Sequence, residues 1–350
     1  MKDKELDIEN DIIKQYFKIL SDEFPEFLYD YINTPEMQRL KGTGCACGTD
    51  HTNIFYNKFF YSNYEHSIGV ALIVWHFTKN KKQTLAGLFH DIATPAFKHC
   101  IDFMNGDSKT QESTEAETEN IIRNSKEIMN LLTRDGILLE EVKDYHIYPI
   151  ADNDTPKLSA DRLEYTFTNG IYFKEVWNLE KIKEIYDNIE ILKNEEGIEE
   201  LGFKSQEIAE EFTVCASKLW PLWISKEDKL TMQFYADVLK EMSNKKMICK
   251  QDLYKLSELE IIEKIKHCGD KRIEDTFYKF QNATQVYESD EKVQGKYCIS
   301  VEGKRRYIIP LVKCEDGTKR INEISKTAKE NIENFLNFDT KKYLYFDFNF

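Results

Sequence analysis

Two histidines and two aspartates stand at positions where helices would bring them together. His66 lies on an apolar helical pattern, His90 and Asp91 adjoin at the end of a second one, and Asp161 lies in a third. Two imidazoles and two carboxylates suit a divalent first-row metal ion and leave coordination positions for water and substrate. We therefore expect one divalent ion, drawn from Mn, Fe, Ni, Co, Zn or Mg. Such an ion would lower the pKa of bound water and polarise a phosphoryl oxygen, which is hydrolytic chemistry.

The hypothesis depends on the joint pattern and not on any one member. A lone histidine on an apolar helix is usually a core or surface residue, and we interpret His76 and His267 in that way. A second possible metal site consists of Cys45, Cys47 and the nearby His51. No further Cys/His pair at zinc-finger spacing follows them, and small residues in a Gly-rich loop also serve the backbone. We therefore favour the His/Asp set.

The elements that must position these side chains are predicted to be helices. From Glu65 onward apolar residues recur at helical spacing, and a second helix is predicted over residues 83–91, ended by Thr94-Pro95. The helix that carries Asp161 is predicted over residues 158–168. Further helices are predicted over residues 34–40, 175–193, 205–220, 228–242 and 251–268, with another beginning near Glu115.

The sequence changes character after about residue 243. Residues 295–300 and 305–312 are rich in β-branched and aromatic residues, and the turn between them predicts a hairpin. A helix over residues 324–335 and a strand over residues 343–348 would complete a small lobe. We predict a mainly α protein with a helical domain over residues 1–242 and a small C-terminal α+β lobe over residues 243–350. The aromatic tail is expected to dock on the helical domain or on another subunit, as in a homo-oligomer.

Composition narrows the classes of partner. The net charge of -14 and the pI near 5.2 argue against duplex DNA binding, which needs clustered Lys and Arg. The basic run at residues 79–82 is interpreted as solvated surface, whereas the run at 304–306 could also bind an anionic effector or a neighbouring subunit. No apolar run is long enough to span a bilayer, and the acidic start lacks a signal-peptide core. The 8 cysteines have no repeated spacing, so we expect reduced thiols and a cytoplasmic location.

The ordered set His66, His90-Asp91 and Asp161 resembles the H…HD…D signature of the HD-domain metal-dependent phosphohydrolases. The flanking sequences also match, namely residues 34–40 (TPEMQRL), 64–70 (YEHSIGV), 95–99 (PAFKH) and 160–165 (ADRLEY). These flanks are most similar to the deoxynucleoside triphosphate triphosphohydrolase branch, over roughly Thr34 to Gly170. The resemblance implies a helical HD-domain bundle, with His66, His90, Asp91 and Asp161 as the metal ligands.

The same resemblance implies further site residues. His99 matches a histidine that faces the substrate phosphate, and Asp102 matches an acidic partner of the catalytic histidine. The family's catalytic His-Glu motif falls on Thr114-Glu115. Threonine cannot shuttle a proton near neutral pH, so proton transfer would fall to His99, Asp102 or Glu115.

Several recognition positions depart from that branch. Asn63 replaces an arginine that contacts phosphate, Thr94 replaces a phosphate-facing histidine, and Cys45 and Asn169 replace residues that read the sugar. Tyr165 keeps the aromatic residue that packs under the sugar. The candidate substrate-binding residues are Arg39, Lys41, Asn63, Thr94, Arg162 and Tyr165.

Two functions follow from this pattern. The preferred one is a phosphohydrolase that uses metal-activated water on a nucleotide or related phosphorylated small molecule, with altered substrate recognition. The alternative is a catalytically weak HD-domain module that binds nucleotides or has a regulatory role. Four ligands kept together with His99 and Asp102 favour the enzyme.

Overall fold

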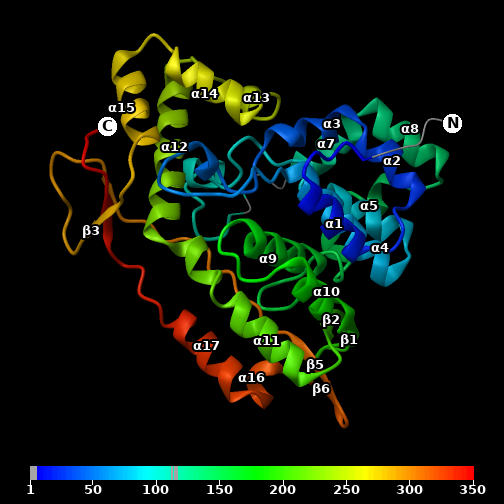
Figure 1. The fold of residues 1–350 in the computed structure, drawn as a ribbon. Coiled ribbons are helices and arrows are strands. Elements are labelled where there is room, and N and C mark those ends of the chain that lie inside the picture. The colour runs from blue at the N-terminus through cyan, green and yellow to red at the C-terminus, as the bar shows by residue number, and fades with distance from the viewer. Residues whose placement is uncertain (1–5, 112, 114–116) are drawn as a thin grey trace.

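The computed structural model describes residues 6–111, 113 and 117–350, and most of its regular structure is helical (Figure 1). The α-helices are α1 (Asp11–Leu20), α2 (Glu26–Ile32), α3 (Pro35–Gln38), α4 (Asn63–Thr78), α5 (Lys81–Phe89), α6 (Cys100–Met104), α7 (Thr118–Asn124), α8 (Lys126–Arg134), α9 (Ala160–Tyr172), α10 (Leu179–Asp187), α11 (Gln206–Ala216), α12 (Lys226–Asn244), α13 (Lys250–Leu253), α14 (Glu258–Lys266), α15 (Lys271–Gln281), α16 (Ile321–Ile324) and α17 (Lys326–Leu336). The predicted mainly α class is confirmed.

The buried residues form two hydrophobic cores, and helix α4 is the central helix of the larger one, which is called the first core. Its sequence explains this position. Ser62 caps its first turn in a capping box with Glu65, and Lys79 ends it in a left-handed conformation at φ 49°. Residues on all sides of α4 are buried, as expected for a helix that is apolar all round. It packs against α5, α9 and α1, which places His66 in the interior.

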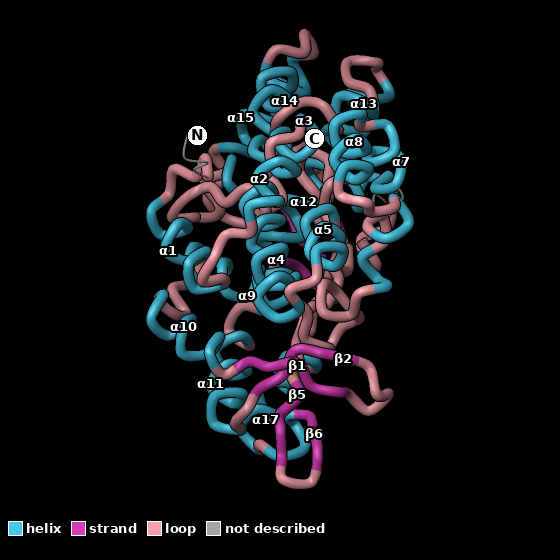
Figure 2. The backbone as a smooth tube through the Cα atoms, turned by 90° about the vertical axis from the view of Figure 1, so that its right-hand side faces the viewer, coloured by secondary structure: helices cyan, strands magenta, loops and turns pink. Residues whose placement is uncertain are grey.

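The strands form two small sheets. The strands are β1 (Ile189–Lys193), β2 (Glu199–Phe203), β3 (Tyr287–Ser289), β4 (Cys298–Ile299), β5 (Leu311–Cys314), β6 (Gly317–Arg320) and β7 (Tyr343–Tyr345). One sheet has the order β1-β2-β5-β6, with β2 and β5 parallel, and the other has the order β3-β7-β4. The four-stranded sheet lies at one end of the molecule beside α11 and α17 (Figure 2).

The prediction of one helix over residues 175–193 is wrong. Helix α10 ends at Asp187, and residues 189–193 form β1, which pairs antiparallel with β2. Ile182, Ile185 and Ile189 are all buried and spaced three or four apart, so helical periodicity extends into the strand. The hairpin turn that follows contains Gly197 at φ 78°, and this turn was the local signal for a strand.

The predicted hairpin over residues 295–312 is also wrong. Residues 298–299 pair with β7, whereas residues 311–314 pair with β6. The two-residue turn Glu315-Asp316 closes this hairpin, and Gly317 follows it at φ 126° as the first residue of β6. The predicted helix over residues 251–268 is divided into α13 and α14, because Ser257 starts a new helix through a capping box with Glu260.

Residues on both sides of position 243 share the same hydrophobic cores. Ile308, Val312 and Ile332 pack in the first core with α1, α4 and α5. The second core joins α12, α14 and α15 to residues 96–103, which follow the His90-Asp91 pair. Residues that sequence reasoning assigned to two domains are therefore packed together. Among the described residues no helix is long and apolar enough to cross a membrane.

Candidate metal centre and active site

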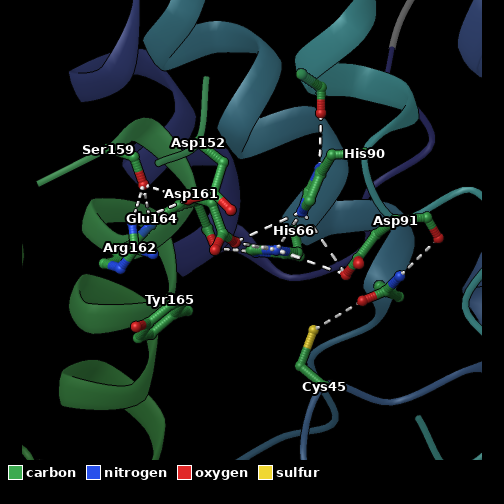
Figure 3. Close-up of polar contacts among 12 residues, drawn as sticks. Cys45, His66, His90, Asp91, Asp152, Ser159, Asp161, Arg162, Glu164 and Tyr165 are labelled. Atoms are coloured by element: carbon green, nitrogen blue, oxygen red, sulfur yellow. Dashed lines mark hydrogen bonds and ion pairs between the residues drawn. The ribbon is translucent and has the colours of Figure 1, made fainter. Parts of the chain in front are cut away.

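Three side chains from different parts of the chain meet in the interior. His66 projects from α4, His90 follows the end of α5, and Asp161 lies in the first turn of α9 (Figure 3). Their nearest ligand atoms all lie within 4.8 Å of one another. Nε2 of His66 is 3.2 Å from Nε2 of His90 and 3.0 Å from Oδ1 of Asp161. This is the one group of its kind in the described part of the chain.

The other nitrogen of each histidine is occupied. Nδ1 of His90 donates to the carbonyl oxygen of Gly87 at 2.7 Å, and Nδ1 of His66 donates to the buried carboxylate of Glu164. In the neutral form that a metal ion requires, both Nδ1 atoms would keep their proton in these bonds, and both Nε2 atoms would present lone pairs toward the same point. Two lone pairs 3.2 Å apart repel each other unless a cation or a proton lies between them. These residues fit a divalent metal ion, with Glu164 and Gly87 as outer-sphere partners.

Asp91 faces this centre from farther away. Its Oδ2 is 3.8 Å from Nε2 of His66 and 3.7 Å from Nε2 of His90. The same oxygen accepts a hydrogen bond from Nζ of Lys98 at 2.9 Å. The structure therefore brings three of the four predicted ligands into direct contact and leaves Asp91 paired with a lysine at the edge of the centre.

The charges around the centre reinforce its affinity for a cation. Burial alone would lower the pKa of His66, but the carboxylates of Glu164 and Asp161 outweigh it and raise the pKa to about 10. Burial also opposes ionisation of Asp161, yet hydrogen bonds from His66 and His90 lower its pKa well below the usual range. Asp161 is therefore ionised, and its charge favours a positive species between the imidazoles.

His99 and Asp102 lie next to this centre as a hydrogen-bonded pair. Nδ1 of His99 donates to Oδ2 of Asp102 at 2.9 Å, and Ser113 donates to Oδ1 of the same carboxylate at 2.6 Å. Asp102 is fully buried, so its geometry is fixed. Burial, together with the charge of Arg306, lowers the pKa of His99. Thr114 and Glu115 lie outside the described residues.

Of the predicted substrate-binding residues, Arg162 and Tyr165 line a cavity of about 200 Å³ that also contains the metal centre. Arg162 donates to Asp152 at 3.0 Å and to Oδ1 of Asn153 at 2.7 Å, so its guanidinium is already paired. Tyr165 packs edge-on against Trp223 with ring centroids 5.2 Å apart. Cys45 and Asn169, at the positions that read the sugar in the similar branch, line the same cavity.

The other four candidates contact protein groups. The guanidinium of Arg39 donates to the backbone carbonyl oxygen of Thr94 at 2.8 Å, three residues after Asp91. Lys41 forms an ion pair with Asp7 at 2.6 Å. Oδ1 of Asn63 accepts a hydrogen bond from Lys98 at 2.7 Å. None of Arg39, Lys41, Asn63 and Thr94 is among the residues that line the cavity.

Sequence reasoning did not place Lys98, Glu164 or Arg306 at this site. Lys98 and the preceding Phe97 both have positive φ, at 44° and 66°, and this conformation turns the lysine toward Asp91. Non-glycine residues rarely adopt it, so the sequence gives no local signal. Glu164 lies one helical turn after Asp161 and could have been found by that spacing. Arg306 belongs to the basic run at residues 304–306, which was interpreted as solvated surface or as a binder of an anionic effector or a neighbouring subunit, and its contact with His99 was not predicted.

The alternative zinc site does not form in the described structure. His51 binds Glu258 through Nε2 at 2.9 Å, and Cys45 faces Asn63. Glu258 also accepts hydrogen bonds from the backbone N–H groups of Gly44 and Phe97 at 3.0 and 3.1 Å. The Gly-rich loop is thereby tied to α14 through a carboxylate rather than a metal.

Comparison with known proteins gives distant relatives. No family model matches the chain. Protein YdhJ of Bacillus subtilis, which is uncharacterised, is 24% identical over 305 residues, which span 87% of this chain and 89% of YdhJ. The metal-dependent phosphohydrolase cns2 of Cordyceps militaris is 23% identical over 146 residues, which span 42% of this chain and 41% of cns2.

Among solved structures, a phosphohydrolase from Bacteroides thetaiotaomicron has a TM-score of 0.61 at 14% identity. The match covers 92% of this chain and 96% of that protein. The last likeness shows that the fold is shared.

Proposed function

We propose that this chain is a metal-dependent phosphohydrolase of the HD-domain type that acts on a nucleotide or a related phosphate ester. The observation that carries the proposal is the facing pair of Nε2 atoms of His66 and His90 beside Oδ1 of Asp161. Two similar proteins named as phosphohydrolases, from C. militaris and B. thetaiotaomicron, support the same class. When bound, a divalent ion would supply Lewis acidity and activate water.

The side chains around the centre have separable tasks in this proposal. Lys98 lies between Asp91 and Asn63 and lines the cavity, where its ammonium group can donate to a phosphate oxygen. Asp102 fixes the tautomer of His99 by accepting from Nδ1, which leaves Nε2 to hold a proton or deliver one to the leaving oxygen. Glu115 stays a third candidate for proton transfer.

The cavity wall supports a substrate with an aromatic or sugar group. Tyr165 and Trp223 form one wall, where a flat group could pack. Asn63 and Thr94 stand where the triphosphohydrolase branch places residues that bind phosphate, and Asn63 is engaged with Lys98. We therefore propose a substrate other than the one typical of that branch, recognised through a single compact phosphate group and an aromatic wall.

One observation favours the alternative of a weakly catalytic nucleotide-binding module. Lys98 pairs with Asp91, and this pairing competes with any role of Asp91 as a metal ligand. The two functions differ in whether metal-loaded protein turns over a substrate.

The deciding experiment is product analysis with Mn²⁺-loaded protein. Nucleoside mono-, di- and triphosphates and 4-nitrophenyl phosphate would be incubated with the protein, and the anions released would be separated by anion exchange. We expect cleavage that is lost in Asp161→Ala together with bound metal. Asp316→Ala is a matched control, because Asp316 pairs with the exposed Lys319 at the β5–β6 turn. Stoichiometric Mn²⁺ without cleavage of any compound would favour the binding module.

A further inference from the structure

Arg306 reaches the site from the chain segment between β4 and β5, more than 200 positions after His99. One of its terminal nitrogens lies 3.1 Å from Nε2 of His99 and donates to the side-chain oxygen of Gln111 at 2.6 Å. Arg306 is half-buried and lines the same cavity as the metal centre. The C-terminal part of the chain thus contributes a guanidinium group beside His99.

This guanidinium forms no ion pair with a described residue, although the carboxyl group of Asp228 lines the same cavity and lies near enough to feel its charge. Within residues 6–111, 113 and 117–350, no carboxylate lies within ion-pair distance of Arg306, and both groups that it contacts are neutral acceptors. By contrast, Lys98 and Arg162 on the same cavity wall are paired with Asp91 and Asp152. A partly desolvated guanidinium that makes no direct ion pair keeps donors available for an anion, and its planar donors match two oxygens of a phosphate.

The contact with His99 also determines which atom is available for proton transfer. A guanidinium can only donate, so Nε2 of His99 must present a lone pair to it, while Nδ1–H donates to Asp102. Arg306 therefore covers the one atom of His99 that could exchange a proton with a substrate. An anion that accepted hydrogen bonds from Arg306 would draw the guanidinium away and uncover Nε2.

We propose that Arg306 is a phosphate-binding residue of this site, and that it exchanges its hydrogen bond with His99 for the phosphate of the substrate. This inference rests on the proposed phosphohydrolase function and adds to it a residue that acts on both binding and proton transfer. Binding of the phosphate would make His99 available only when a substrate is present. The neighbouring Arg305 has no such role, because it donates to the carbonyl oxygens of Phe335 and Phe338.

The test compares Arg306→Gln with Arg305→Gln, since both remove one positive charge from adjacent positions. Binding of inorganic phosphate to the Mn²⁺-loaded full chain would be measured by calorimetry, and KM and kcat would be measured on the best substrate. We expect Arg306→Gln to weaken phosphate binding about 10- to 100-fold, because it removes a hydrogen bond to a charged group. We also expect it to raise KM, keep bound Mn²⁺ and alter the pH profile of kcat. Arg305→Gln should match the wild type in phosphate affinity.

Unchanged phosphate affinity and KM in a folded Arg306→Gln variant would overturn this inference and leave the phosphohydrolase proposal intact. Wild-type protein that holds Mn²⁺ but neither binds phosphate nor cleaves any ester would overturn both. If the variant is unfolded, the wild-type chain still gives a test through arginine modification by phenylglyoxal, read by mass spectrometry. Phosphate should protect Arg306 and leave Arg305 unaffected, and equal labelling of Arg306 with and without phosphate would contradict the inference.

Discussion

His66 and Glu164 act as one unit at the metal centre. Glu164 is fully buried and accepts from both Nδ1 of His66 and the hydroxyl of Tyr61, the latter at 2.6 Å. The added Cβ of an alanine at Gly69 would lie 2.8 Å from the Glu164 side chain, so the chain leaves room for this carboxylate. Glu164 thus fixes the ring orientation of His66 without being a metal ligand itself.

The first prediction concerns this outer-sphere carboxylate. Glu164→Gln should lower Mn²⁺ affinity about 10- to 100-fold, because an amide holds the Nδ1–H tautomer less firmly and removes a charge. Metal titration followed by competition with a chelator would measure the loss. Tyr61→Phe removes the other hydrogen bond of Glu164 and should change the affinity much less. Equal effects of the two variants would contradict a specific role for the contact with His66.

The second prediction concerns Asp228, whose carboxyl group lines the cavity. Burial raises the pKa of Asp228 to about 7, although the nearby charge of Arg306 opposes the rise. An acid whose pKa is higher in the folded state than in the unfolded state makes folding less favourable as pH rises between the two values. Asp228→Asn should therefore raise the melting temperature relative to wild type at pH 8 and change it little at pH 4. Thermal denaturation at both pH values would measure this, and a constant difference would contradict it.

At this scale the sequence indicated the chemistry but not its full surroundings. His66, His90 and Asp161 could be identified because each lies on a recognisable helical pattern. Lys98 could not, since its orientation depends on two consecutive left-handed residues that carry side chains. Arg306 could not, because the contact with His99 depends on the packing of a distant segment.

At the scale of elements, the helices that carry the ligands were predictable, as was strand β7 within residues 343–348, whereas β1 and β2 were not. Helices α4 and α5 have side-chain caps at Ser62 and Asn80, and both carry continuous runs of buried residues. Strand β1 continues the apolar spacing of α10, so local pattern alone favoured one long helix. Residues 189–193 are distinguished from a continued helix only by the pairing of β1 with β2 and by the packing of both strands.

The third prediction concerns the link between α14 and the segments around the site. Oε1 of Glu258 accepts from the N–H groups of Gly44 and Phe97, and Oε2 faces His51. Glu258→Ala would leave buried donors unsatisfied and should lower the free energy of unfolding by at least about 2 kcal/mol. Glu258→Gln keeps one carbonyl oxygen and should lose less. Urea denaturation would measure both losses.

A matched control lies in the same helix. Glu260 accepts from Ser257 in an exposed capping box, so Glu260→Ala should cost only about 0.5–1 kcal/mol. If Glu258→Ala and Glu260→Ala were equally destabilising, the buried link would have no special role. Glu258 holds the backbone of Phe97, which comes directly before Lys98 and His99 in the chain. Loss of this hydrogen bond should disturb the position of both side chains, so Glu258→Ala should also lower kcat.

At the scale of the whole molecule, the C-terminal part pairs and packs with the N-terminal part. Strand β5 pairs with β2, and Arg320 on β6 forms an ion pair with the fully buried Glu200 at 2.6 Å. The orange and red segments in Figure 1 run down the left side and along the bottom of the molecule. Composition could indicate a mixed C-terminal segment, but sheet partners more than 100 residues apart have no local signature.

The fourth prediction tests the two predicted domains directly. A chain of residues 1–242 would lack β5 and the packing partners of α12, so we expect it to unfold without a cooperative transition. Circular dichroism during urea denaturation would show this, with the full chain as the control. A cooperative transition in the fragment, with bound Mn²⁺, would show instead that the helical segment is an independent domain.

The parallel pairing of β2 with β5 has a consequence for synthesis of the chain. When β2 leaves the ribosome it can pair with β1, but its other edge has no partner until residues 204–310 have also been made. At typical translation rates this delay is on the order of 10 s. During that time the nascent protein presents an open strand edge of the kind that promotes aggregation. A chaperone that binds newly made chains would therefore be needed most after β2 has been synthesised and before β5 has paired with it.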